Sequence, residues 1–356
     1  MSDFTFIDLF AGIGGIRIGF ESAGGTCVFS SEYDRFAQVT YKAFFGTAPV
    51  FEERLQVEPP GDITKIPGDM LDQVIPDHDI LTAGFPCQPF SLAGVSKKQS
   101  LGKPHGFKDP TQGTLFFNIK EVLSVKKPKA FFIENVKNLK SHDKGRTYQI
   151  IIETLSSLGY VMAPRIIDAA GWVPQHRERI YILGFRNDLM DEFEAVQFQR
   201  EKLDQIAPPE KGIDLTEVLE EDVPDKYILG RGTWNTLKRH KKYHESKGQG
   251  FGYGIIEKPY DRQITRTLSA RYHKDGAEIL ISRGGRRHPR RLTPLECSRL
   301  MGFPEEFQRY FEREGGGIQP VSDTQAYRQF GNSVVVPVVT DLAGLLVTEM
   351  KSRIKH

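Results

Sequence analysis

The chain has 356 residues, a net charge of +2, and hydrophobic and charged fractions of 39% and 26%, which are those of an ordinary globular protein with one large domain or two unequal ones. Its three scattered cysteines argue against a disulfide framework and lack the spacing of zinc ligands. The sequence has no secretory leader and no apolar run of about 20 residues, so we expect a cytoplasmic protein without a membrane span.

Strand-like and helical patterns alternate through the first half of the chain. The sequence predicts short strands at 4–10, 26–30, 79–83, 130–133 and 180–185, with helices at 15–23 and 34–45. Such alternation indicates βαβ units, so we expect an α/β fold with a doubly wound, mostly parallel sheet. Functional side chains gather at the carboxyl ends of such strands, and Glu32, Cys87 and Glu134 each lie just past one.

The second half has a different composition. Residues 188–225 are acidic and contain prolines, which predicts a linker with one short helix. Residues 226–291 hold 17 Lys and Arg against 5 Asp and Glu, interleaved with aromatic residues and glycines, and show no pattern of a long helix. Their net charge of +12, against −10 for the rest of the chain, predicts a face that binds a polyanion.

A capped helix follows this basic block. Thr293 and Glu296 have the spacing of a capping box, and an apolar helix is predicted over 334–347. We expect a large domain, a smaller domain inserted into it together with the acidic linker, and a return to the large domain. The predicted boundaries are 1–187, 188–290 and 291–356.

A glycine-rich turn, Phe10-Ala11-Gly12-Ile13-Gly14-Gly15, joins the first predicted strand to the first helix. Its glycines let the backbone approach a ligand at the N-terminus of a helix. Glu32 lies 20 residues after Gly12, at the end of the second strand, where a carboxylate typically binds ribose hydroxyls. We therefore expect a cofactor that contains adenosine. Arg17 occupies the third glycine position of the dinucleotide fingerprint, which disfavours a nicotinamide oxidoreductase.

Cys87 is the candidate nucleophile. It follows Pro86 on a turn just past a predicted strand, whereas a structural cysteine would be expected inside the apolar run. Three more residues, Glu134, Arg177 and Arg179, lie in loops next to predicted strands. Taken alone, these residues are better interpreted as a solvated acid and surface ion pairs, so only the combination of motifs is informative.

In this order the motifs resemble those of the DNA (cytosine-5)-methyltransferases. The matching segments span almost the whole chain, at 6–15, 61–64, 84–88, 134–136, 175–179, 292–304 and 331–333. The resemblance implies an enzyme that flips a cytosine out of duplex DNA and transfers a methyl group from S-adenosyl-L-methionine to C5. It implies S-adenosyl-L-homocysteine as the product, no metal, and an irregular, β-rich target-recognition domain as the smaller domain.

The resemblance also assigns roles to the site residues. Cys87 adds to C6 of the cytosine, and Glu134 contacts N3 and the exocyclic amine and supplies a proton. Arg177 hydrogen-bonds O2, while Arg179 organises the loop. The implied cofactor contacts are Phe10, Gly12, Gly14 and Gly15 at the methionine end, Glu32 at the ribose, Tyr33, Asp62 and Ile63 at the adenine, and Asn332 and Ser333 close by.

Two segments of the basic block carry a finer resemblance. Residues 240–253 are similar to segments of enzymes that methylate CCGG-type and CCWGG sites, and residues 265–280 are similar to the Dcm-like CCWGG branch. The implied site is CCWGG, methylated at the inner cytosine, with CCGG-containing or CCNGG sites as alternatives. The implied DNA contacts are Gln88, Ser91, Lys97, Lys98, Lys241, Lys247, Arg266, Thr267 and Arg271.

Duplex DNA is the implied partner, a cognate restriction endonuclease is left open, and we expect a monomer in a prokaryotic cytoplasm. A transfer-RNA methylase with the same core is one alternative, but such an enzyme lacks the pattern seen at 240–280. A non-catalytic DNA-binding relative is another, but such chains usually lose the equivalents of Cys87 or Glu134.

Overall fold

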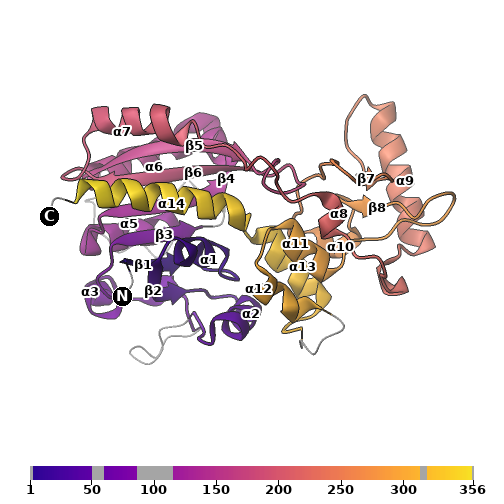
Figure 1. Ribbon diagram of the computed structural model, residues 1–356, viewed down its shortest axis with the longest axis horizontal. Coiled ribbons are helices and arrows are strands. Elements are labelled where there is room, and N and C mark those ends of the chain that lie inside the picture. The colour runs from indigo at the N-terminus through magenta and orange to yellow at the C-terminus, as the bar shows by residue number, and fades with distance from the viewer. Residues whose placement is uncertain (1–2, 50–59, 86–114, 313–318, 355–356) are drawn as a thin grey trace, which may run out of the picture.

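The structure is a computed structural model that describes residues 3–49, 60–85, 115–312 and 319–354. A large lobe holds the central sheet and both ends of the described chain, and a smaller lobe lies beside it (Figure 1). The last helix, α14 (Val336–Arg353), returns from the smaller lobe and runs along the sheet.

Six strands form the central sheet in the order β2-β1-β3-β4-β6-β5. Their bounds are β1 Phe4–Leu9, β2 Gly25–Ser31, β3 Ile80–Gly84, β4 Ala130–Val136, β5 Tyr160–Asp168 and β6 Glu178–Arg186. The first four pair in parallel, and β6 is antiparallel to both β4 and β5, which confirms the mostly parallel α/β fold. The sequence did not predict β5, an edge strand that contains Pro164 and whose side chains show mixed exposure.

Alternate side chains of the strands enter two cores, one on each face of the sheet. On β4, Phe132 packs into the first core, and Phe131 and Ile133 pack into the second. Because the side chains on both faces of these strands are buried, their sequences are continuous apolar runs. The first core includes α1 (Gly15–Ser22), α2 (Arg35–Phe45), α7 (Glu192–Phe198) and α14, and the second includes α3 (Leu71–Val74), α5 (Leu115–Lys126) and α6 (Arg146–Ser157).

The final helix, α14, is a core helix of the large lobe. It crosses α1 so closely that a Cβ on Gly19 would lie 2.7 Å from Val339 Cγ1. The helical stretch Asp323–Arg353, which contains α14, is long and apolar enough by length and composition to cross a membrane. In this fold, 61% of its apolar window is buried inside the protein, as expected for a helix that covers one face of a sheet.

The smaller lobe has little sheet among its described residues. Its elements are α8 (Leu215–Val218), α9 (Arg231–Ser246), β7 (Ile255–Ile256), α10 (Tyr272–Asp275), β8 (Leu280–Ile281), α11 (Pro294–Leu300), α12 (Glu305–Gln308) and α13 (Asp323–Asn332). This differs from the expected β-rich domain without a long helix, because each strand has two residues and α9 has 16. Within α9 the buried residue is Leu237, so the helix lacks an apolar stripe, while its Lys and Arg residues favour helix intrinsically.

The division between the lobes also differs from the predicted boundaries. Residues 188–205 pack on the large lobe: Phe198 of α7 meets Phe185 edge to face with ring centroids 5.2 Å apart, and Lys202 pairs with Glu349 of α14 at 2.6 Å. The helices α11, α12 and α13 lie with the smaller lobe (Figure 1). The return to the sheet therefore begins at α14 rather than at α11.

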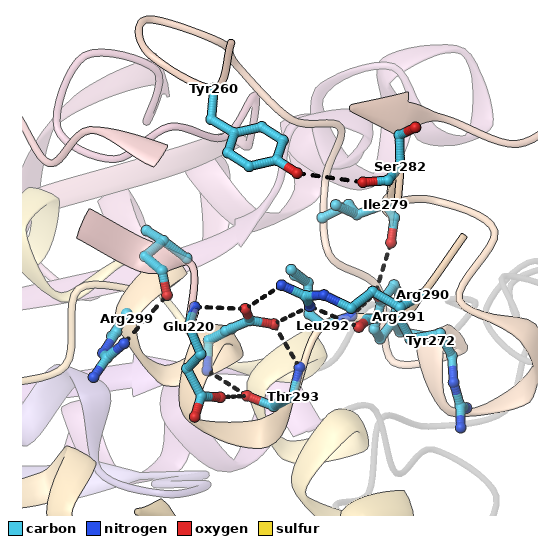
Figure 2. Close-up of polar contacts among 12 residues, drawn as sticks. Glu220, Tyr260, Tyr272, Ile279, Ser282, Arg290, Arg291, Leu292, Thr293 and Arg299 are labelled. Atoms are coloured by element: carbon cyan, nitrogen blue, oxygen red, sulfur yellow. Dashed lines mark hydrogen bonds and ion pairs between the residues drawn. The ribbon is translucent and has the colours of Figure 1, made fainter. Parts of the chain in front are cut away.

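A buried ion pair fixes the start of α11 (Figure 2). The carboxylate of Glu296 accepts from both terminal nitrogens of Arg290, at 2.7 Å and 2.8 Å, and also from Glu220 N at 2.8 Å. The predicted capping box is present, since Thr293 N donates to Glu296 Oε2 (2.8 Å) and Glu296 N donates to Thr293 Oγ1 (3.1 Å). These hydrogen bonds offset the cost of burying the two charges.

Candidate active site

The turn after β1 has a backbone that requires its glycines. Gly12 and Gly14 have φ values in the left-handed region, +56° and +83°. A Cβ on Gly14 would lie 2.2 Å from Phe45 Cε2 of α2, and a Cβ on Gly15 would lie 2.9 Å from Val334 Cγ2. A side chain would collide with a neighbour at Gly14 and Gly15, so their absence of a Cβ lets α1 start in close contact with Phe45 and Val334.

Glu32 holds the glycine turn from the end of β2. Its Oε2 accepts a hydrogen bond from Gly12 N (2.9 Å), and its Oε1 accepts one from Asp34 N (2.7 Å). The side chain is buried, and burial raises the pKa of the carboxyl, although the two N–H groups act in the opposite direction. Each carboxylate oxygen keeps a lone pair for a further donor, such as a ligand hydroxyl.

The turn and Glu32 open onto a cavity of about 710 Å³ whose walls come from both lobes. Among the predicted site residues, its lining includes Phe10, Gly12, Gly15, Glu32, Tyr33, Asp62, Ile63, Glu134, Arg179, Arg271, Asn332 and Ser333. Gly14 does not line it and packs on Phe45 instead. In the described ranges, no group of three or more His, Cys, Asp or Glu side chains is arranged to hold a metal ion.

Glu134 and Arg179 form an ion pair in a buried part of this cavity. Glu134 lies on β4 opposite Gly84 of β3, and its Oε1 is 3.1 Å from Arg179 Nε on β6. Burial raises the pKa of the Glu134 carboxyl, against the positive charges of Arg179 and then Arg177. A buried carboxyl that keeps its proton can act as an acid toward a ligand.

Arg177 does not line the cavity, although the sequence predicted it as the contact to the base. Its side chain is 2% exposed and donates to the carbonyl oxygens of Leu268 (2.8 Å), Gly331 (3.0 Å) and Ser333. Burial, and then the charge of Arg179, lowers its pKa to about 9. Arg177 therefore joins three chain segments, while Arg179, predicted to organise the loop, faces the ligand space.

The predicted nucleophile and the loop that follows it lie outside the described residues, and the residues concerned are Cys87, Gln88, Ser91, Lys97 and Lys98. The last described residue before them is Phe85, which lines the cavity. Its carbonyl oxygen accepts a hydrogen bond from Asn135 Nδ2 at 2.8 Å. The chain that leads to Cys87 is thus fixed to the strand end that carries Glu134.

The two predicted lysine contacts of the smaller lobe lie against aromatic rings. Lys241 Nζ is 4.6 Å from the ring centroid of Tyr253, and Lys247 Nζ is 5.9 Å from that of Tyr243. Cation–π contacts of exposed side chains are weak, so both ammonium groups remain able to approach a phosphate.

The predicted arginine and threonine contacts have different surroundings. Arg266 Nη1 donates to Gly252 O (2.6 Å), so it supports the loop before β7. Thr267 Oγ1 donates to His176 O and joins the smaller lobe to the loop before β6. Arg271 is exposed and lines the cavity. Of these residues, Arg271 is the one that lines the same cavity as the predicted cofactor and acid residues.

Ser31 and Arg328 are among the lining residues that the sequence-based prediction missed. Ser31 Oγ is buried and has no hydrogen-bond partner among the described residues. Arg328 is exposed on α13, four residues before Asn332. Residues four apart share one face of a helix, so this spacing was a usable signal for Arg328. Nothing in the sequence distinguishes Ser31 from an ordinary strand residue.

Comparisons with known proteins add an independent observation. The family model for C-5 cytosine-specific DNA methylase matches residues 4–347. The chain is 48% identical to a DNA-cytosine methyltransferase of Escherichia coli (strain K12), over 99% of this chain and 79% of that protein. It is 46% identical to Type II methyltransferase M.NlaX of Neisseria lactamica, over 96% of this chain and 95% of that protein. Among solved structures, the S. pombe Dnmt2 methyltransferase has the same fold, with a TM-score of 0.69 and 20% identity over 97% of this chain and 98% of that chain.

Proposed function

This chain belongs to the C-5 cytosine-specific DNA methylase family and is a DNA cytosine methyltransferase, and from that premise we propose that it methylates the inner cytosine of CCWGG. The observation that supports methyl transfer is one cavity that the glycine turn, Glu32 and the Glu134–Arg179 pair all line. The resemblance of 240–253 and 265–280 to CCWGG enzymes supports the site, and the charge of +12 over 226–291 supports binding to DNA.

The cavity fits S-adenosyl-L-methionine, which supplies an electrophilic methyl group when bound. A volume of about 710 Å³ lies in the usual range of ligand pockets. Glu32 has lone pairs available for ribose hydroxyls, and the buried hydroxyl of Ser31 lacks a partner that a polar ligand would provide. The residues proposed to hold it are Phe10, Gly12 and Gly15 at the methionine end, Glu32 at the ribose, Tyr33, Asp62 and Ile63 at the adenine, and Asn332 and Ser333 beside them.

Cys87 is the proposed nucleophile. Its thiolate adds to C6 of the target cytosine, and the resulting enamine makes C5 nucleophilic enough to accept a methyl group. The base reaches the cavity by leaving the stack of the duplex. After methylation, the C5 proton leaves to a base and the Cys87 thiolate is eliminated.

Glu134 and Arg179 are proposed to stabilise this adduct. The raised pKa of Glu134 leaves a proton available for N3 as negative charge builds on the ring. Arg179 donates to O2, because its guanidinium lines the cavity beside Glu134. Arg177 is proposed to hold the segments at Leu268 and Gly331 in place beside the cavity, through their carbonyl groups.

The proposed partners follow from the same reaction. Duplex DNA is the substrate, and action on chromosomal DNA places the enzyme in the cytoplasm. M.NlaX and M.HpaII are named type II methyltransferases, which supports a cognate restriction endonuclease for the same site.

Bisulfite sequencing of DNA from cells that express the protein tests the proposed site. We expect the inner cytosine of CCAGG and CCTGG to be protected, with a roughly 5- to 160-fold slower reaction at CCCGG and CCGGG, because one wrong base pair costs about 1–3 kcal/mol. Equal protection at all four sequences would contradict CCWGG and leave the enzyme class standing. Cys87→Ser should leave every cytosine unprotected.

A further inference from the structure

The open part of the cavity carries two arginines without an acidic partner. Arg271 and Arg328 both line the cavity and are both exposed. By contrast, the side chains of Glu134 and Arg179 are 11% and 15% exposed. In the ranges that the structure describes, neither Arg271 nor Arg328 takes part in an ion pair. The Glu134–Arg179 pair therefore marks the buried part of the cavity, and the two exposed arginines mark its mouth.

The carboxylates in the lining are already engaged. Glu134 pairs with Arg179, and Glu32 accepts from two backbone amides. Asp34 caps α2 by accepting from two backbone amides, and Asp62 accepts from the backbone and side chain of Thr64. Among the described residues, none of these four carboxylates forms an ion pair with Arg271 or Arg328. An anion that enters from outside would supply the missing negative charge.

Two buried tyrosines pack together the chain segments that carry these arginines. Arg271 precedes Tyr272 of α10, Arg328 follows Tyr327 of α13, and the two tyrosine rings meet edge to face with centroids 5.2 Å apart. Leu292 N donates to Tyr272 OH (2.7 Å), and Tyr327 OH donates to Leu292 O (2.6 Å); Figure 2 shows Tyr272 beside Leu292. Because the backbone on both sides is fixed, little of it has to be ordered when the arginines bind an anion.

We propose that Arg271 and Arg328 clamp a backbone phosphate of the DNA strand whose cytosine enters the cavity, an inference that rests on the proposed methylation of DNA. A flipped cytosine stays attached to its sugar and phosphates. When the base lies beside Glu134, those phosphates therefore lie at the mouth. Guanidinium groups match phosphate oxygens in charge and in hydrogen-bond geometry. The clamp holds the flipped nucleotide in place and carries no sequence information of its own.

The salt dependence of DNA binding tests the clamp. Arg271→Gln, Arg328→Gln and the double variant are compared with the wild type on a duplex that contains one CCTGG site. Each lost phosphate contact should lower the slope of log affinity against log salt by about 0.9, so the affinity defect of each single variant should shrink about 3.5-fold between 50 and 200 mM salt. Arg200→Gln, an exposed arginine on the π-helix Gln199–Leu203 and not part of the lining, should keep the wild-type slope.

A modified duplex then tests which phosphate is held. The phosphates on either side of the target cytosine are replaced, one at a time, by uncharged methylphosphonate. At the clamped position the wild type should lose as much affinity as the double variant does, and the double variant should lose nothing further, as expected for partners in one interaction. Losses that add at both positions would overturn the proposal.

The other anion that Arg271 and Arg328 could bind, in place of a DNA phosphate, is the carboxylate of the cofactor. Calorimetry with S-adenosyl-L-homocysteine should give the same dissociation constant for both variants as for the wild type, within about twofold, which also reports that they are folded. A tenfold weaker cofactor affinity, or an unchanged DNA salt slope, would overturn the clamp. Methyl transfer by the wild type is measured on the same duplex, so failure of the proposed site and failure of the clamp give different results.

Discussion

Among the described residues of the site, Glu134 is the one whose protonation we expect to make methyl transfer depend on pH. Burial raises its pKa, so this carboxyl keeps its proton to a higher pH than an exposed glutamate does. When the pH rises through that value, the group becomes a carboxylate held by Arg179, which cannot supply a proton to the base.

We therefore expect the single-turnover rate of methyl transfer to fall as the pH rises through the raised pKa of Glu134. Glu134→Gln should remove this falling limb and lower the rate by about 10²–10⁴-fold, the usual contribution of general acid catalysis. The measurement is a pH–rate profile at saturating DNA and cofactor. Glu153→Gln, an exposed position on α6, should reproduce the wild-type profile. If the falling limb remains in Glu134→Gln, another group causes it.

Truncation of the two arginines of the 175–179 loop should affect different properties: stability for Arg177 and activity for Arg179. Arg177→Ala leaves three carbonyl groups without their charged donor, so we expect a loss of at least about 3 kcal/mol in the free energy of unfolding. Arg179→Ala should unfold closer to the wild type, because Glu134 can keep its proton. Its kcat/KM should nevertheless drop roughly ten- to hundredfold. Denaturant unfolding and methylation kinetics of both variants separate the structural role of Arg177 from the ligand contact of Arg179. An Arg177→Ala protein with wild-type stability would contradict this assignment.

The sequence-based prediction identified both arginines as site residues but assigned the base contact to Arg177, whereas Arg179 is the one that lines the cavity. β6 begins at Glu178, between the two, so the side on which each guanidinium lies depends on where this strand starts. Element boundaries are the least reliable part of a prediction from sequence. The spacing of Gly12 and Glu32, in contrast, predicted that both belong to one cofactor site; both line the same cavity, and Gly12 N donates to Glu32 Oε2.

At the level of elements, the C-terminal end of α13 packs on the segment before α10 with almost no space between their backbones. A Cβ on Gly331 would lie 2.3 Å from Ala270 N and 2.3 Å from Ser269 C. This contact brings Arg271 and Asn332 to the same cavity. The glycine is therefore required by packing against backbone atoms, which cannot move aside as a side chain could.

Gly331→Ala should cost about 1–3 kcal/mol of stability through overpacking and should weaken cofactor binding, because the 269–271 segment must shift. The matched control is Gly344→Ala on α14, where an added Cβ meets nothing within 4 Å. That change should be neutral or stabilise the protein by up to about 1 kcal/mol, since alanine favours a helix over glycine. Thermal unfolding and calorimetric titration of the two variants provide the comparison; equal effects would refute the packing argument.

Elements were predictable where their residues are buried on both sides. β1, β3 and β4 show as apolar runs because each lies between two cores. α9 was not predictable in this way, since its place depends on a tertiary contact: Trp234 packs on Tyr253 with ring centroids 4.7 Å apart. The sequence of a basic, surface-exposed helix does not reveal such a partner.

At the level of the whole molecule, both lobes line the cavity proposed for the cofactor, so we expect cofactor binding and the association of the lobes to be linked. At a concentration of S-adenosyl-L-homocysteine 100 times its dissociation constant, we expect the protein to gain about 2.7 kcal/mol of stability. Glu32→Ala should weaken cofactor affinity roughly ten- to hundredfold, and the gain at the same concentration should fall to about 0.4–1.4 kcal/mol. The ligand-induced shift in unfolding is the measurement, since Glu32 also supports the glycine turn of the free protein. A full gain in the variant would show that Glu32 does not bind the cofactor.

The walls of the cavity come from opposite ends of the polypeptide, and this separates their synthesis in time. Glu32 and Asn332 are 300 residues apart, which corresponds to about 15–60 s at 5–20 residues per second on the ribosome. During that interval the nascent chain has the glycine turn but neither α13 to complete the cavity nor α14 to cover α1. A growing or prematurely terminated chain therefore cannot hold the methyl donor, and we expect methylation of the chromosome to begin only with finished molecules.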